Sequence, residues 1–198
     1  MNVITHALFG WGLATAVPGL SRGDKGWIVF AAVAPDLDGL GLVAELATRN
    51  SDSPLFWWSE YHHLLAHNLL FAALLSLTAA VMTRRASLGA LAFGSITLHF
   101  LCDLAGSRGP DGYQWPLHYL WPISDQPAWT VPWQWQLNAR PNAVISLALL
   151  AYTFWAAHRY GTSPLELVSA RANSQLVATL RHRFPSSKTT PDMPRRVA

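Results

Sequence analysis

The stretch "LLAHNLLFAALLSLTAAVM", residues 64–82, decides the fold class of this chain. It contains no charged side chain, and its length is close to the roughly 20 apolar residues that an α-helix needs to cross a bilayer. We therefore predict a helix over about residues 63–83, either in a membrane or deep inside a helical bundle. The segments on both sides of it repeat the pattern.

Four further segments have similar apolarity, at about residues 3–20, 26–47, 86–106 and 141–158. Charged residues make up 13% of the chain, about half the share usual in soluble domains. We predict an all-α fold, a polytopic membrane helical bundle with about four to five apolar helices. The segment 26–47 is the weakest, because "APDLDGLG" interrupts it. A compact all-α domain that only partly enters the bilayer is the alternative.

The basic residues are distributed unevenly between the connections. If the loops alternate sides, one side holds eleven of the fourteen lysines and arginines, and the other holds only Arg49, Arg108 and Arg140. Basic loops stay in the cytoplasm, so we predict a multi-pass inner-membrane protein with a cytoplasmic C-terminal tail. This topology explains the pI near 9.4 without nucleic acid as a partner, and membrane lipids are the expected partners.

We divide the chain into three parts: a membrane-embedded helical metal-site domain over residues 1–160, a possible amphipathic helix over 161–183, and a basic tail over 184–198. The helix would lie on the anionic inner leaflet or on the protein surface, and the tail has a disordered composition. The apolar N-terminus lacks the features of a cleaved signal peptide. The outer loop from Ser107 to Arg140 is rich in tryptophan, which predicts an interfacial aromatic belt or the wall of a substrate groove.

Polar side chains are costly inside apolar segments and need partners. Because Cys102 is the only cysteine, a metal site would use histidine and carboxylate ligands. The candidates cluster near the ends or breaks of the apolar segments: His6, Asp36, Asp38, His62, His63, His67, His99 and Asp103.

The spacing of these candidates favours a common site. His63 and His67 are four residues apart, as are His99 and Asp103, so each pair would share a helix face. Proline and glycine in "PDLDG" allow a local break that turns both carboxylates inward. In the predicted topology most candidates reach one level near the outer ends of the helices. Each signal alone also has a plain structural explanation, such as helix capping by the aspartates.

The motifs "ITHALFG", "APDLDGL", "HHLLAHNLL", "HFLCD" and "GYQWPLHYLWPIS" occur in this order within residues 1–158. In this respect the chain resembles the YdjM-like family of membrane-bound, metal-dependent hydrolases. The resemblance implies that His6, Asp36, Asp38, His99, Asp103 and one or more of the histidines at 62, 63 and 67 form the metal site. The family often has an H-R-G-x-T-H-S-like stretch where this chain has "HHLLAHN". That alignment favours His62 with His67, whereas helix geometry favours His63 with His67.

The expected activity is that of a hydrolase with one or two divalent metal ions. Mixed imidazole and carboxylate ligands favour zinc. Asp36, Asp38 and Asp103 are the candidate catalytic residues, as bridging ligands or acceptors of a proton from water. The substrate would be an ester or phosphoester, including a lipid-like amphiphile. The alternatives are a non-enzymatic metal-binding protein or cation transporter, and a haem protein with paired axial histidines. Neither a G-x-S-x-G motif nor a Walker-type loop occurs.

Overall fold

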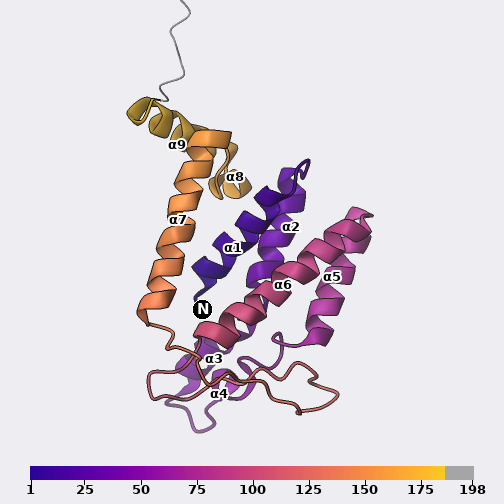
Figure 1. Ribbon diagram of the computed structural model, residues 1–198. Coiled ribbons are helices and arrows are strands. Elements are labelled where there is room, and N and C mark those ends of the chain that lie inside the picture. The colour runs from indigo at the N-terminus through magenta and orange to yellow at the C-terminus, as the bar shows by residue number, and fades with distance from the viewer. Residues whose placement is uncertain (186–198) are drawn as a thin grey trace, which may run out of the picture. The chain divides into compact units, whose positions relative to one another are not determined.

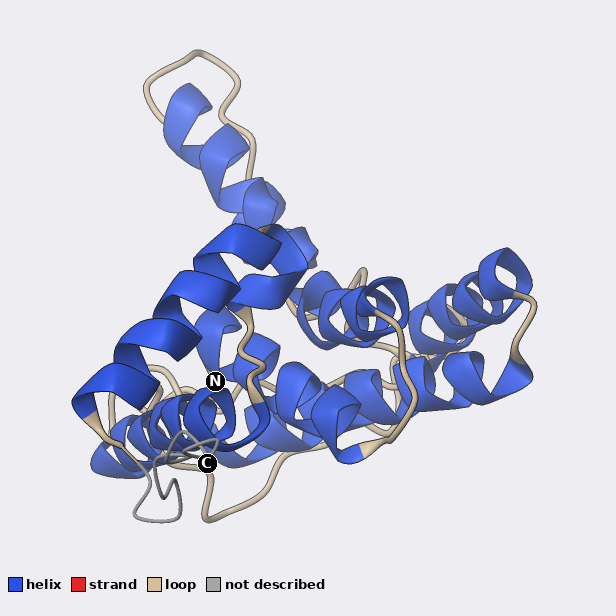
Figure 2. Ribbon diagram, turned by 90° about the horizontal axis from the view of Figure 1, so that it is seen from above, coloured by secondary structure: helices blue, strands red, loops and turns tan. Residues whose placement is uncertain are grey.

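The structure of the protein is a computed structural model that describes residues 1–185. The described part of the chain is all-helical and contains no strand (Figure 2), which confirms the predicted all-α class. It divides into two compact units, one from Met1 to Leu150 and one that begins at Ala151. The predicted tail over 184–198 lies outside the described residues from residue 186 onward.

The elements follow the predicted apolar segments closely. In chain order they are α1 (Val3–Ala16), α2 (Arg22–Val33), the 3-10 helix η1 (Ala34–Leu40), α3 (Gly41–Thr48), α4 (Trp57–Tyr61), α5 (Leu69–Thr83), α6 (Ala86–Gly106), α7 (Arg140–Tyr160), α8 (Leu165–Val168) and α9 (Ala170–Arg183). The last two helices lie within the predicted 161–183 segment. Its association with a membrane stays a prediction.

Within residues 1–185, two helical stretches are long and apolar enough to cross a membrane, Arg22–Thr48 and Ala86–Gly106. The helices α1 and α5 are apolar but have only 14 and 15 residues. At 1.5 Å per residue, α5 is about 22 Å long, against a hydrocarbon core of about 30 Å. The predicted four to five spanning helices are therefore not confirmed.

Four helices, α1, α2, α5 and α6, pack together in the first unit. Small side chains such as Ala31, Ala72, Ala79 and Ala92 fill the core between them. Such residues allow helix backbones to approach closely, as in membrane helix packing. The connections η1, α3, α4 and the loop after α6 gather at one end of this unit, where α6 ends and α5 begins (Figure 1).

The helix α5 begins later than its apolar sequence predicts. Asn68 is its N-cap and accepts a hydrogen bond from the backbone N–H of Phe71. The same side chain donates to the carbonyl groups of Leu64 and Leu65, which closes a turn before the helix. The predicted helix start near residue 63 is therefore wrong, and His63 and His67 precede the helix. The predicted break at "PDLDG" is confirmed, because residues 34–40 form η1.

Candidate metal centre

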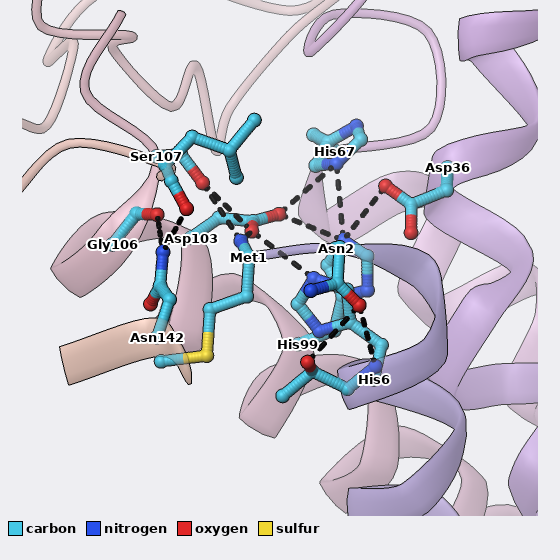
Figure 3. A network of polar contacts seen from close by, with 12 residues as sticks. Met1, Asn2, His6, Asp36, His67, His99, Asp103, Gly106, Ser107 and Asn142 are labelled. Atoms are coloured by element: carbon cyan, nitrogen blue, oxygen red, sulfur yellow. Dashed lines mark hydrogen bonds and ion pairs between the residues drawn. The ribbon is translucent and has the colours of Figure 1, made fainter. Parts of the chain in front are cut away.

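Asp103, near the end of α6, is the centre of a buried polar network (Figure 3). Its Oδ2 atom lies 2.9 Å from Nε2 of His99 one helical turn earlier, as the spacing predicts. The Nε2 atom of His6, from α1, lies 3.1 Å from Oδ1 of Asp103. The rings of His6 and His99 stack with their centroids 3.8 Å apart. Two helices therefore bring three side chains with metal-ligating atoms together.

Asp36 completes the first group of possible ligands. It lies in η1, and its Oδ1 atom is 3.8 Å from Nε2 of His99. Because η1 breaks the helix between α2 and α3, the Asp36 carboxylate can reach the side chains of α1 and α6. Ligand atoms from the four residues lie within 4.8 Å of one another: His6, Asp36, His99 and Asp103.

A second group of candidate ligands also includes Asp103. It contains His63, His67 and Asp103, and their ligand atoms also lie within 4.8 Å of one another. Nε2 of His67 lies 3.5 Å from Oδ2 of Asp103, and the His63 and His67 rings stack at 4.4 Å. The two groups share Asp103.

Two of the histidines are held by acceptors behind their rings. Nδ1 of His99 donates to the carbonyl oxygen of Ala32 at 2.7 Å, and Nδ1 of His67 donates to Oδ2 of Asp38 at 2.9 Å. In each ring Nε2 is the nitrogen left to bind a cation, and the two Nε2 atoms are 3.1 Å apart. A carbonyl or carboxylate behind the ring is the usual way in which proteins orient a metal-ligating histidine.

The structure places Asp38 and His62 beside the two groups but in neither. Oδ1 of Asp38 accepts a hydrogen bond from Nδ1 of His62 at 2.8 Å, while its other oxygen binds His67. The ring of His62 stacks on Trp58 at 3.7 Å. The structure thus brings His63, not His62, within ligand distance of His67 and Asp103. Helix geometry, the reason for pairing His63 with His67, does not apply, because His63 has a left-handed backbone with φ 66°.

Several buried atoms of the two groups have no hydrogen-bond partner among the described residues. They are His6 Nδ1, Asp36 Oδ2 and His63 Nδ1. An unpartnered buried polar atom costs about 1–3 kcal/mol, so three of them in one cluster need an explanation. A divalent cation accepts lone pairs from nitrogen and oxygen atoms of this kind. The side chains therefore fit a metal centre.

The two histidines before α5 differ in their proton affinity. Burial lowers the pKa of His63 well below its ordinary value, and the nearby His67 lowers it further. Burial also lowers the pKa of His67, but hydrogen bonds to Asp103 and Asp38 outweigh this effect and raise it to about 9. His63 is thus neutral and ready to bind a cation, whereas His67 holds a proton that a cation would displace.

Some contributors to the network were not predicted from the sequence. The hydroxyl of Ser107 donates to Oδ1 of Asp103 at 2.9 Å, and the amino group of Met1 contacts both residues. The spacing of four residues between Asp103 and Ser107 was the available signal. The contact of Met1 had no sequence signal. His118, His158 and His182 belong to neither group of ligands.

Comparison with known proteins agrees with the family resemblance of the motifs. No curated protein and no solved structure matches this chain significantly. The model of the YdjM inner membrane protein family matches residues 1–180, which extends beyond the motifs in residues 1–158 and includes most of α9. This chain belongs to the YdjM inner membrane protein family.

Proposed function

We propose that this protein is a metal-dependent hydrolase of the inner membrane that acts on an ester or phosphoester. One observation carries the proposal: two groups of buried imidazoles and carboxylates share Asp103, and all the ligand atoms in each group lie within 4.8 Å of one another. Buried polar side chains with only a structural role would be paired by hydrogen bonds, whereas three buried atoms of these groups are unpartnered.

The ligand set favours zinc, in one or two ions. Histidine nitrogen and aspartate oxygen are both ordinary zinc ligands. His6, Asp36, His99 and Asp103 would hold one ion, and His63, His67 and Asp103 would hold the other. Such ions act as Lewis acids and lower the pKa of a coordinated water toward about 7.

The two aspartates of η1 would have different tasks. Asp36 has the most exposed carboxylate of the first group and an unpartnered Oδ2, so it is the best placed to accept a proton from water. Asp38 would orient His67 rather than bind the metal itself. In the reaction, the oxygen of water bonds to the acyl carbon or phosphorus, the bond to the alcohol oxygen breaks, and that oxygen receives a proton.

Elemental analysis and a chelation assay test this proposal. We expect the purified full chain to hold about one or two equivalents of metal per chain, in line with the two ligand groups. The double variant His99→Ala, Asp103→Ala should lose this metal, and His182→Ala, an exposed histidine outside both groups, should keep it. A panel of esters and phosphoesters should show turnover that a chelator abolishes and added zinc restores. Turnover that is indifferent to chelation, or unchanged metal in the double variant, would contradict the proposal.

A cation transporter is the second candidate, and the distribution of the ligands weighs against it. A transport pathway needs polar groups on both sides of the bilayer midplane. The ligands instead gather where α6 ends and α5 begins, together with η1. Haem ligation by His67 and His99 is a poorer fit, because nitrogen atoms 3.1 Å apart leave no room for a porphyrin between them.

A further inference from the structure

A cavity of about 420 Å³ opens beside the metal centre. Its wall comes from α4, from the turn that follows it, and from the loop over residues 113–118. Three aromatic side chains, Trp58, Tyr113 and Trp115, line it together with Glu60 and His118. This volume is in the range of pockets that bind small molecules.

His63 connects the cavity to the metal centre. It lines the cavity and also belongs to the ligand group with His67 and Asp103. Its ring lies against Trp115, with centroids 4.6 Å apart, and its buried Nδ1 has no partner. A non-glycine residue at φ 66° is uncommon and needs support from its surroundings. His63, with its left-handed backbone, is thus the candidate ligand that belongs both to the metal centre and to the wall of the cavity.

The chemistry of the wall selects the charge of a ligand. Among the described residues that line the cavity there is neither lysine nor arginine, and Glu60 carries a carboxylate. Nδ1 of His118 donates to the carbonyl oxygen of Asp125 at 3.0 Å, a contact that fits the tautomer with an acceptor at Nε2. Aromatic faces and acceptors together attract cations, in particular ammonium groups.

We propose that the cavity binds the aminoalkyl part of a zwitterionic phosphoester, with the ammonium group near Glu60 and the phosphate directed past His63 to the metal centre. This inference rests on the proposed function and narrows its substrate class. The phosphate needs no lysine or arginine, because the cations bound by the ligand groups would balance its charge. Such an ester is either a phospholipid head group or its water-soluble counterpart.

The test uses the metal-loaded full chain and two pairs of probes. One pair is soluble, glycerophosphoethanolamine and glycerophosphoglycerol. The other consists of vesicles that contain phosphatidylethanolamine or phosphatidylglycerol. We expect calorimetric binding and turnover to favour the amine in at least one pair, and the pair that shows this preference identifies the source of the substrate. Equal behaviour toward amine and glycerol probes in both pairs would overturn the inference.

A variant with an intact metal centre makes the test specific. Glu60→Gln should reduce the preference for the amine by about two- to fivefold, the size expected for the loss of a solvent-exposed ion pair. Asp52→Asn removes another exposed carboxylate, which does not line this cavity, and should leave the preference unchanged. An unaltered preference in Glu60→Gln would also overturn the inference. The two proposals can fail separately. Chelator-sensitive turnover without a preference for the amine would refute only the proposed amine-binding cavity. Glu60-dependent binding of the amine probe without turnover would refute only the proposed hydrolase activity.

Discussion

The Nε2 atoms of His67 and His99 face each other at 3.1 Å, although the two residues come from different elements of the fold. His99 is fixed by the carbonyl group of Ala32, and His67 by the carboxylate of Asp38. With both rings neutral, two lone pairs would point at one another and at the carboxylate of Asp103. A proton on His67 relieves this repulsion, and metal ions held by the two ligand groups would relieve it by accepting the two lone pairs.

Metal binding should therefore release a proton from His67. Since its pKa is raised to about 9, His67 is protonated at pH 7.5 in the metal-free protein, and a cation must displace that proton. We expect the apparent affinity for zinc to rise by about tenfold per pH unit from this group, and to level off above pH 9. Calorimetric titrations in buffers with different ionisation enthalpies would measure the released proton. No dependence on the buffer would contradict the protonated state.

The same pKa makes a prediction for the stability of the metal-free protein. Because the folded pKa lies above the ordinary value of 6.5, the stabilising contribution is complete below pH 6.5 and is lost as the pH rises through 9. Thermal unfolding of the chelated protein should therefore occur at a lower temperature at pH 9.5 than at pH 6. Zinc-loaded protein is the control, and it should show a smaller decrease. A flat profile for the chelated protein would count against the ion pairs of His67.

Asp38 provides a test of ligand orientation as distinct from ligation. Its two oxygens hold His62 and His67, and it lies outside both ligand groups. The variant Asp38→Asn should keep the fold but weaken zinc binding by about 10- to 100-fold, as is typical when a carboxylate behind a histidine ligand is lost. Competition with a fluorescent chelator would measure this change. Asp52→Asn is the matched control, and equal affinities in the two variants would argue against the orienting role.

Part of the site could be predicted from the sequence because its local geometry is regular. His99 and Asp103 lie in an uninterrupted helix, so a spacing of four residues placed them on one face. Proline and glycine likewise predicted the break that forms η1. These arguments need only the backbone of one element, and they hold without knowledge of its neighbours.

The division of tasks among the other candidates depends on tertiary contacts that sequence spacing does not contain. Asp36 and Asp38 are two residues apart in η1, and one reaches His99 while the other holds His62 and His67. The apolar sequence from residue 64 onward also gave no sign of the N-cap at Asn68. Because α5 begins after this cap, His63 and His67 lie before the helix. His63 meets His67 through a left-handed backbone rather than along a helix face.

Close packing between η1–α3 and α4 should control the position of His62 and His63. A Cβ atom on Gly41 would lie 2.8 Å from the backbone carbonyl carbon of Trp57, so Gly41→Ala must displace α4. We expect a loss of about 1–3 kcal/mol in the free energy of unfolding, together with weaker zinc binding. Gly94→Ala is the control, because nothing lies within 4 Å of its Cβ position in α6. It should be neutral or stabilise the protein by up to about 1 kcal/mol. Equal unfolding temperatures for the two variants would refute the packing argument.

The distribution of lysine and arginine predicts the orientation of the chain in the inner membrane. Only three of the fourteen basic residues, Arg49, Arg108 and Arg140, fall in the connections assigned to the outer side. A fluorescent protein fused after Ala198 should therefore fluoresce, and alkaline phosphatase at the same position should be inactive. Phosphatase inserted in the loop after Ser107 should be active, because this loop is predicted to lie on the outer side of the membrane. The metal centre would then lie near the outer leaflet. Carbonate extraction should leave the chain in the membrane fraction. Release into the supernatant would support the alternative of a compact helical domain that only partly enters the bilayer, while an active C-terminal phosphatase would reverse the predicted orientation.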